Sequence, residues 1–449
     1  MKHLFLIRHA KSSWDSDNLS DKDRPLNPRG EEQLAPLGRA LRRYGAMTGE
    51  IHVSPALRAQ QTLKGIFPDS PSDVQVYTDP ELYTFDYRRL LQWLQTCGDQ
   101  VQTLAIVGHN PALLELAASL VPQAPFELPT ASFIHIRLPI KHWRKLGKRE
   151  GRLETFLTPV DFSFEAFNRK NQKRHKNAGK ATVKDTPSVL LGQAESLAQL
   201  HRGVMLGLDD EFLHQYRIAL RRSRAVAESL AEVTGNKSLK SHISHLKRHA
   251  QATSNLRDLH VFSQDLPQLC SDQPELLKAL EQWVCARVDK EQKKLAKRLA
   301  SKRYRQSLHS WEDELQSRQF RKLIDKLSTR DIQKSVDHRL RMFNRKTAEL
   351  LHDSPDEDIH NLRKLLKRIR YLMELDIDSW KSALKTLRQR QDLYGRFQDL
   401  HVQIELVKRF ASNYPEDPNG ALQALLDHLI IKKDDTRRLI LSIGGLKAG

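Results

Sequence analysis

Residues 4–15, LFLIRHAKSSWD, carry the strongest fold signal in the chain. Four apolar residues run directly into Arg8 and His9, so that a buried strand would end where two basic side chains begin. In open α/β sheets, ligands bind in the crevice beyond the carboxyl ends of the strands. The stretch is therefore either a basic surface turn or an anion-binding site at the mouth of a buried sheet.

Alternating strand and helix patterns surround this stretch up to about residue 160. Short apolar runs predict strands, and segments with helical periodicity predict helices. The expected strands are 3–7, 51–54, 74–77, 103–108 and 132–138, and the expected helices are 27–45, 87–97 and 110–121. This alternation predicts a three-layer α/β domain over residues 1–160, in which helices cover both faces of a mostly parallel sheet.

Three other segments place phosphate-binding residue types at loop-to-helix junctions or strand ends. They are SPALRAQQT (54–62), with Ser54 as the expected helix cap, GHNP (108–111) and RPLNPRG (24–30). Arg58 would lie in the first turn of a helix, where an anion is favoured, and His109 follows an apolar strand. Arg24 and Arg29 add guanidinium groups, which suit phosphate oxygens. A single histidine at a strand end is usually structural, but the combination favours a phosphate site.

In this order, LIRHAKSSW, DRPLNPRG, SPALRAQQT and IVGHNP resemble the histidine phosphatase superfamily, and best of all its small SixA-like phosphohistidine phosphatases. The resemblance covers about residues 1–160. It implies that His9 is the nucleophile and becomes phosphorylated, while Arg8, Arg58 and His109 bind the phosphoryl group. It implies no metal and no other cofactor.

The resemblance leaves the general acid open. Larger members of the superfamily protonate the leaving oxygen with a carboxylic acid, for which Glu81 is the first candidate here and Asp86 and Asp23 are others. An imidazole, with a pKa of about 6.5, leaves without the strong acid that an alkoxide needs. We therefore expect a phosphohistidine in a protein as substrate, with a small phosphoester or the end of a polyphosphate chain as alternatives.

Most of the net positive charge of the chain lies in the residues that follow residue 160. Of the net charge of +19, residues 1–160 contribute only +3, and the remaining residues hold 54 Lys+Arg against 38 Asp+Glu. Residues 168–184, NRKNQKRHKNAGKATVK, contain seven basic and no acidic residues, which predicts a flexible linker over 161–190. The asymmetry points to a polyanionic partner for the second part, unless its basic surface is simply solvated.

The second part has helical patterns throughout, and it repeats itself. DDEFLHQYRIALRRSRAVAESL (209–230) is similar to DEDIHNLRKLLKRIRYLMEL (356–375). Some forty residues later follow NLRDLHVF (255–262) and RFQDLHVQ (396–403). These matches predict an all-α domain over 191–445, built of two duplicated helical bundles at about 191–310 and 320–445.

Each repeat carries a stripe of cations along one helix face. The first stripe is His214, Arg217, Arg221 and Arg224, with Arg222 beside it, and the second is His360, Arg363, Lys367 and Arg370, with Lys364 beside it. The spacing of 0, 3, 7 and 10 places each stripe within an arc of about 80°. Stacked cations are unfavourable unless they are neutralised, either by an anionic ligand or by acids such as Asp258 and Asp399.

These repeated motifs resemble the CHAD domain, the conserved histidine α-helical domain, over about residues 190–440. The resemblance implies that basic residues line a central cavity that binds inorganic polyphosphate. A nucleic-acid-binding protein with a vestigial phosphatase domain is the alternative. The stripes contain few interleaved aromatic residues and no known nucleic-acid motif, which disfavours nucleic acid as a partner.

Cysteine usage and hydropathy bear on location. Cys97, Cys270 and Cys285 are too few and too irregular for a disulfide framework or a metal site. The N-terminus has no signal-peptide pattern, and no apolar stretch is long enough to span a bilayer. We therefore expect a cytoplasmic protein without a membrane partner, and polyphosphate granules are a candidate location.

Overall fold

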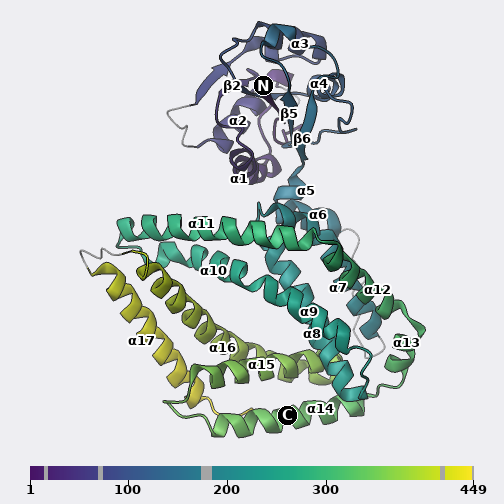
Figure 1. The fold of residues 1–449 in the computed structure, drawn as a ribbon, viewed down its shortest axis with the longest axis vertical. Helices are drawn as coiled ribbons and strands as arrows, with labels where there is room; N and C mark the ends of the chain where they lie inside the picture. The colour runs from purple at the N-terminus through teal and green to yellow at the C-terminus, as the bar shows by residue number, and fades with distance from the viewer. Residues whose placement is uncertain (15–18, 69–73, 173–184, 415–419, 447–449) are drawn as a thin grey trace. The chain divides into compact units, whose positions relative to one another are not determined.

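The computed structural model describes residues 1–14, 19–68, 74–172, 185–414 and 420–446 (Figure 1). The chain divides into two compact units, Met1–Lys176 with Leu206–Asp209, and Asn177–Met205 with Asp210–Gly449. The described residues of the first unit form an α/β fold, and those of the second are helical. None of the described helices combines the length and the apolar character needed to cross a membrane.

A six-stranded sheet forms the centre of the first unit, with the strand order β3-β2-β4-β1-β5-β6. The strands are β1 (Lys2–Arg8), β2 (Glu50–Val53), β3 (Gln75–Thr78), β4 (Thr103–Gly108), β5 (Phe133–Leu138) and β6 (Arg152–Leu157). Strands β1 to β4 pair with one another in parallel, β5 pairs antiparallel with β1, and β6 pairs antiparallel with β5. The predicted mostly parallel sheet is confirmed. Strand β6 was not expected, because an edge strand with an exposed face carries charged residues and lacks a clear apolar run.

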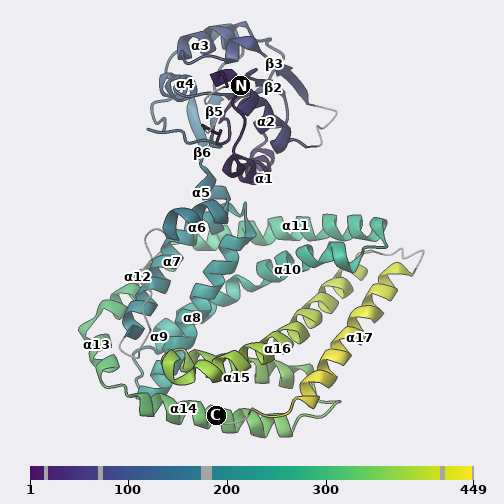
Figure 2. The same ribbon diagram turned by 180° about the vertical axis from the view of Figure 1, so that it is seen from behind.

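Successive residues of the central strand β1 enter two separate cores. Leu4 and Leu6 pack in one core with α3 (Tyr87–Thr96) and α4 (Ala112–Leu120). Phe5 and Ile7 pack in the other core with α1 (Pro28–Arg43) and α2 (Leu57–Ile66), as the helices around the sheet in Figure 2 illustrate. The unit therefore has the three layers that were predicted. Packing from both faces fixes the carboxyl end of β1, where Arg8 and His9 lie.

The expected flexible linker over 161–190 is helical at both of its ends. The helices there are α5 (Pro159–Phe162), α6 (Phe164–Gln172) and α7 (Thr186–Leu206). Thr158 and Asp161 form a capping box that starts α5, and Phe162 is fully buried in the core beside the sheet. The linker prediction was thus wrong for these two ends, because the lysine-rich composition of 168–184 was extended over apolar residues that pack. Residues 173–184 lie outside the described part of the chain.

The second unit consists of α7 and of helices from α8 to α17 in the described residues. Their bounds are α8 (Asp210–Thr234), α9 (Lys240–Ala252), α10 (Ser254–Leu269), α11 (Pro274–Leu299), α12 (Lys302–Gln316), α13 (Arg318–Asp325), α14 (Thr329–Ala348), α15 (Asp356–Met373), α16 (Ile377–Ala411) and α17 (Ala421–Ser442). Helices α10 and α11 lie side by side, as do α16 and α17, and the two pairs share one apolar core (Figures 1 and 2).

The duplicated sequence motifs occupy equivalent helices. The two cationic stripes lie on α8 and α15, and the two later motifs lie on α10 and α16. The match aligns Thr253, where the chain passes from α9 to α10, with Tyr394, which lies in the interior of α16 after the kink of that helix at Trp380. The predicted all-α architecture of duplicated helical bundles is confirmed, with one helix in the second repeat where the first repeat has two.

Candidate functional site

Two neighbouring strands bring His9 and His109 together. Strands β1 and β4 are parallel, and Arg8 pairs in register with Gly108, so each histidine follows its strand at the same edge of the sheet. The backbone N–H of His9 donates to the carbonyl of Gly108 at 3.2 Å. The two imidazole centroids lie 5.1 Å apart, and the residues are only 7% and 2% exposed.

Arg58 completes this pair from the first turn of α2. Its Nε donates to His9 Nε2 at 3.3 Å, and the residue is 4% exposed. The other ring nitrogen, His9 Nδ1, lies 2.7 Å from the carbonyl oxygen of Ala10 and therefore carries the proton. His9 Nε2 consequently keeps its lone pair on the side of the ring that the guanidinium faces.

Both histidines are neutral at neutral pH. Burial is the main cause that lowers the pKa of His9 to about 3, and the charges of Arg58, Arg8 and Arg24 act in the same direction. Burial likewise lowers the pKa of His109 to about 3, with further contributions from His9 and Arg58. A neutral imidazole is the form that can attack phosphorus.

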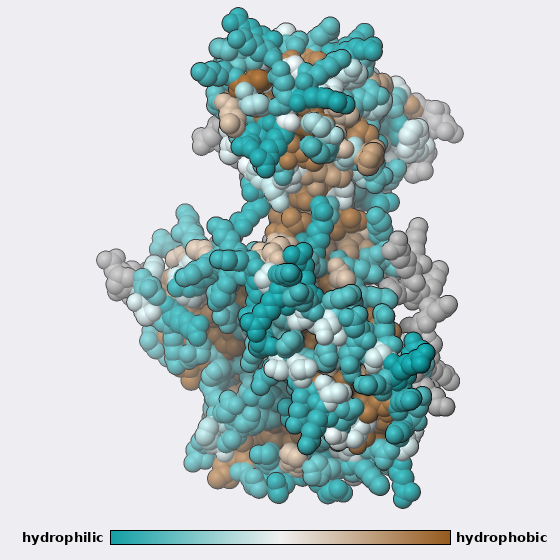
Figure 3. Space-filling model, turned by 45° about the vertical axis from the view of Figure 1, so that its right-hand side comes forward, coloured by the Kyte–Doolittle hydropathy of each residue, from teal (hydrophilic) through white to brown (hydrophobic). Residues whose placement is uncertain are grey.

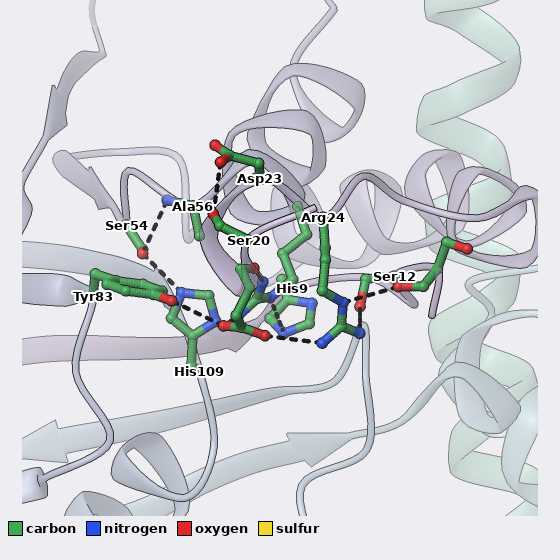
Figure 4. A network of polar contacts seen from close by, with 12 residues as sticks. His9, Ser12, Ser20, Asp23, Arg24, Ser54, Ala56, Tyr83 and His109 are labelled. Atoms are coloured by element: carbon green, nitrogen blue, oxygen red, sulfur yellow. Dashed lines mark hydrogen bonds and ion pairs between the residues drawn. The ribbon is translucent and has the colours of Figure 1, made fainter. Parts of the chain in front are cut away.

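Ser54 orients His109 and does not cap α2. The residue before α2 is Ala56, which provides no side-chain cap, so the cap predicted at Ser54 was wrong. Ser54 Oγ instead lies 2.8 Å from His109 Nε2 and accepts a long hydrogen bond from the N–H of Ala56 (Figure 4). Ser54 Oγ can donate its hydrogen to Nε2 in the tautomer of His109 that carries the ring proton on Nδ1. In the described structure this buried Nδ1 has no hydrogen-bond partner.

Arg8 lies beside these residues but is held differently. It is half-buried, and its Nη1 donates to the carbonyl of Leu128 at 2.7 Å. Its charge is close enough to lower the pKa of both His9 and His109. The structure thus brings together all four residues to which the family resemblance gives a catalytic role.

The carboxylate that contacts this group is Asp21, which the sequence reasoning missed. Asp21 lies in the short helix η1 (Asp21–Asp23) and accepts hydrogen bonds from Arg58 Nη2, Arg24 Nη1 and the Tyr83 hydroxyl, each at 2.9 Å. Burial would raise the pKa of Asp21, but hydrogen bonding to Arg58 and Tyr83 and the charge of Arg58 lower it to about 2. Its place three residues before Arg24 of the RPLNPRG segment is a weak sequence signal, because Asp23 lies closer to that segment.

The three carboxylates proposed as the general acid have other contacts. Asp23 accepts a hydrogen bond from Ser20 (Figure 4), and Asp86 caps the start of α3. Glu81 lies exposed in the short helix η2 (Pro80–Leu82). In the described part of the chain, none of these three hydrogen-bonds or ion-pairs with the histidine pair or with Arg58. Glu81, Asp86 and Asp23 therefore stay predictions for the general acid.

Aromatic side chains surround the histidine pair. Tyr83 lies edge-on to His109 with a centroid distance of 5.5 Å, and Phe85, which is 50% exposed, lies 6.1 Å from the same ring. The guanidinium of Arg24 stacks on Trp14 at 3.5 Å. A planar ring that enters the site would therefore meet aromatic faces. The described residues contain no group of three His, Cys, Asp or Glu side chains that could hold a metal ion.

Besides the histidine site of the first unit, the helical unit contains a charged cavity of about 630 Å³. Three stripe residues of α15 line it, namely Arg363, Lys367 and Arg370, together with Arg396 and Asp399 of α16. Arg221 of α8 is near enough for its charge to lower the pKa of both Arg363 and Lys367. The view in Figure 3 shows mostly hydrophilic residues over the helices.

Some stripe cations are paired with acids. The ion pairs are Arg222–Glu374 at 3.7 Å, Arg224–Glu228 at 3.5 Å, Lys364–Glu357 at 3.4 Å and Arg370–Glu374 at 2.9 Å. Three others are held through hydrogen bonding or partial burial: Arg217 donates to Thr253 Oγ1 at 2.7 Å, His360 bonds Gln398, and His214 is half-buried. Neutralisation by neighbouring acids therefore accounts for part of each stripe.

Arg221, Arg363 and Lys367 form no ion pair with any described residue. Burial, followed by the charges of Arg363 and Arg221, lowers the pKa of Lys367 to about 6. Burial also raises the pKa of Asp258 and of Asp399, although nearby arginines oppose this. Arg221 and Arg363 therefore leave positive charge at the centre of the stripes, and an anion bound there would raise the pKa of Lys367 and favour its protonated form.

Comparison with known proteins finds a matching family for each of the two units. The model of the histidine phosphatase superfamily (branch 1) matches residues 4–92, and that of the CHAD domain matches residues 188–408. An uncharacterized protein of Mycobacterium tuberculosis is 33% identical over 133 residues, which are 30% of this chain and 81% of that protein. Phosphohistidine phosphatase SixA of Escherichia coli is 29% identical over 140 residues, covering 30% of this chain and 84% of that protein.

Among solved structures, the CHAD domain from the plant Ricinus communis is 21% identical, with a TM-score of 0.48. The match covers 60% of this chain and 94% of that one. The chain belongs to the histidine phosphatase superfamily through its SixA-like N-terminal unit, and its helical unit is a CHAD domain.

Proposed function

We propose that the N-terminal unit dephosphorylates phosphohistidine in proteins through a phosphorylated His9, and that the CHAD domain binds inorganic polyphosphate. The contact between Arg58 Nε and His9 Nε2 at 3.3 Å carries the first part. A guanidinium at this nitrogen keeps the imidazole neutral and attracts the phosphoryl oxygens that approach it. The similar SixA protein of E. coli is named for this reaction.

The reaction has two steps. In the first, the lone pair of His9 Nε2 attacks phosphorus, and the bond from phosphorus to the substrate imidazole breaks. The leaving imidazole takes a proton from solvent. In the second, water attacks phosphorus, Nε2 recovers its lone pair, and inorganic phosphate and a proton are released. Arg8, Arg58 and the Nδ1–H of His109 bind the phosphoryl oxygens in both steps.

The aromatic neighbours support an imidazole leaving group. Tyr83 and Phe85 next to His109 offer faces on which the ring of a phosphohistidine can stack. Asp21, with its pKa lowered to about 2, is ionised at neutral pH and is a poor proton donor. An imidazole tolerates this, whereas an alkoxide leaving group needs an acid.

Substitution of the nucleophile tests the phosphatase. His9→Ala should lower the turnover of a phosphohistidine peptide by about a thousandfold or more, because the covalent step is lost. The control is His142→Ala, which removes an exposed histidine of the same unit that pairs with Asp99. Near-normal turnover by His9→Ala would refute the mechanism. Faster turnover of small phosphoesters than of the peptide by the wild type would refute the substrate.

The unpaired cations Arg221, Arg363 and Lys367 support polyphosphate as the ligand of the CHAD domain. A flexible phosphate chain can follow two cationic helix faces into a cavity. A DNA duplex is stiff, and with a major groove of about 12 Å its full width is too large to enter the same cavity. The test is binding of polyphosphate, RNA and double-stranded DNA at physiological salt. Polyphosphate should bind most tightly, and a preference for the duplex would exclude this ligand.

A further inference from the structure

A second group of cationic side chains in the helical unit shares no residue with the stripes. It surrounds a cavity of about 310 Å³ where α9, the end of α11 and the start of α12 meet. The basic residues that line it are His245, Arg248, His249, Arg298 and Arg303.

The three arginines come from three different helices or helix ends. Nη2 of Arg298 donates to the backbone carbonyl of Arg248 at 3.2 Å, which holds these two residues together. In the described structure, no carboxylate forms an ion pair with Arg248, Arg298 or Arg303. The N-terminus of α12, a helix of 15 residues, adds its partial positive charge to the same place.

A buried histidine completes the cavity and has an unused polar atom. His249 is 8% exposed, and its Nε2 lies 2.6 Å from Ser307 Oγ. That hydroxyl donates its hydrogen to the carbonyl of Tyr304 at 2.7 Å, so His249 Nε2 must be the donor to Ser307. His249 Nδ1 is therefore unprotonated, and in the described structure this buried atom has no hydrogen-bond partner. Buried polar atoms without a partner are rare and require an explanation.

We propose that this cavity is a second anion-binding site, which takes a phosphate group between Arg248, Arg298 and Arg303, with His249 beneath it. Guanidinium forks from three directions match the oxygens of a tetrahedral phosphate. The phosphate belongs either to a small molecule such as pyrophosphate or to the end of a polyphosphate chain.

Binding at this site is coupled to proton uptake. Burial, together with the charges of Arg298, His245 and Arg248, lowers the pKa of His249 to about 4. His245 is also shifted to a lower pKa by burial and by its neighbours Arg248, His242 and Arg303. A bound anion opposes these cations and lets His249 Nδ1 take up a proton and donate to it. Affinity therefore rises as the pH falls.

Calorimetry with pyrophosphate on the full chain separates the two cavities. The background variant Arg363→Gln with Lys367→Gln disables the α15 cavity. It should retain one class of binding site, which the additional changes Arg298→Gln and Arg303→Gln weaken about tenfold or more. Both of these arginines are exposed, so the changes spare the core. The matched control is Lys293→Gln with Lys297→Gln on α11, which should change the affinity less than about twofold.

The outcomes are distinct. Absence of pyrophosphate binding in the background variant overturns the proposal, as does an equal effect of the arginine pair and the lysine pair. The same variants titrated with long-chain polyphosphate identify the source of the phosphate. Tighter binding than pyrophosphate assigns the site to chain ends, and weaker binding assigns it to small phosphates.

A second measurement does not depend on the affinity of any variant. Sulfate is a tetrahedral dianion that does not titrate near neutral pH, so the protons taken up on its binding come onto the protein. Calorimetry of the background variant in two buffers of different ionisation enthalpy should show net proton uptake, which Arg298→Gln with Arg303→Gln removes. Sulfate binding without proton uptake would contradict the role of His249.

Discussion

His9 owes its chemistry to its immediate neighbours. The carbonyl of Ala10 fixes the proton on Nδ1, and Arg58 faces Nε2, so that the reactive nitrogen and the phosphate-binding group lie together. Burial keeps the ring neutral. At this scale, hydrogen bonding and desolvation prepare His9 for its proposed role as nucleophile, and neither requires a carboxylate in contact with the ring.

Asp21 competes with a phosphoryl group for Arg58, since it already accepts a hydrogen bond from Arg58 Nη2. Asp21→Asn removes this negative charge, so we expect inorganic phosphate to inhibit the variant about five to ten times more strongly than the wild type. Product inhibition measures the effect. Asp23→Asn is the matched control, because Asp23 contacts Ser20 and not Arg58. Weaker phosphate inhibition of Asp21→Asn would mean that Asp21 orients Arg58.

The lowered pKa values of His9 and His109 make stability depend on pH. Each pKa is about 3 in the folded protein and 6.5 in the unfolded chain, so the unfolded state binds more protons between these values. This contribution is complete above pH 6.5 and is lost as the pH falls toward 3. For His109 alone, a change from pH 6.5 to pH 5 lowers the free energy of unfolding by about 1.5 kcal/mol.

Hydrogen exchange of the β1 amides measures this loss in the full chain. The His109→Gln variant has no titrating ring at this position. Its free energy of unfolding should therefore fall by about 1.5 kcal/mol less than that of the wild type between pH 6.5 and pH 5. An equal loss in both proteins would show that His109 is not the group responsible.

At the scale of elements, α8 and α15 carry the duplicated stripes, but their cations are not equivalent. Arg224 and Arg370 each pair with the glutamate four residues later, and Arg222 of α8 pairs with Glu374 at the end of α15. Arg363 and Lys367 instead line the cavity without an ion pair among the described residues. Of these pairs, Arg222–Glu374 links the two helices. The cations without an ion pair are the ones proposed to bind the ligand.

Removal of the two cavity cations should weaken polyphosphate binding. We expect Arg363→Gln with Lys367→Gln to lower the affinity about tenfold or more, and to reduce the slope of log K against log salt by about one to two. Filter binding over a salt series measures both. The control, Lys381→Gln with Lys385→Gln, makes the same number of substitutions of basic residues at exposed positions of α16. An equal loss in the control would point to nonspecific attraction by the net charge.

At the scale of the whole molecule, the chain links a phosphatase unit to a unit proposed to bind polyphosphate. Each unit has its own apolar cores, in the sheet of the first and between the α10–α11 and α16–α17 pairs of the second. Such separation allows each unit to fold independently. Binding of polyphosphate would then place the phosphatase where the polymer accumulates.

Brief trypsin treatment should therefore cut first within residues 173–184, which contain five Lys and Arg residues and few apolar ones. Two resistant fragments should result, and mass spectrometry identifies their ends. The described residues on either side of this range are helical, in α6 and α7, so we do not expect early cleavage there. Early cuts throughout both units would contradict independent folding.

Local patterns in the sequence were sufficient for the architecture. Apolar runs of strand length predicted five of the six strands, and the repeated helical motifs predicted the duplication, because burial of alternate or periodic residues dictates both. The same patterns placed His9 and His109 at the ends of two strands of one sheet, and Arg58 at the start of a helix that follows a strand of that sheet. Parallel strands end at the same edge, so these residues had to converge.

What the sequence alone determined is thus the order of elements, the positions of the proposed nucleophile His9 and of Arg58 and His109 at the ends of their elements, and the two basic stripes. Only the tertiary structure decided which carboxylate meets Arg58, which stripe cations lack an ion pair, and that His249 is buried beside three arginines. These properties depend on contacts between residues far apart in the chain, such as Asp21 with Tyr83 and His249 with Ser307. Local periodicity states which face of an element is buried, but it does not state which side chain lies opposite.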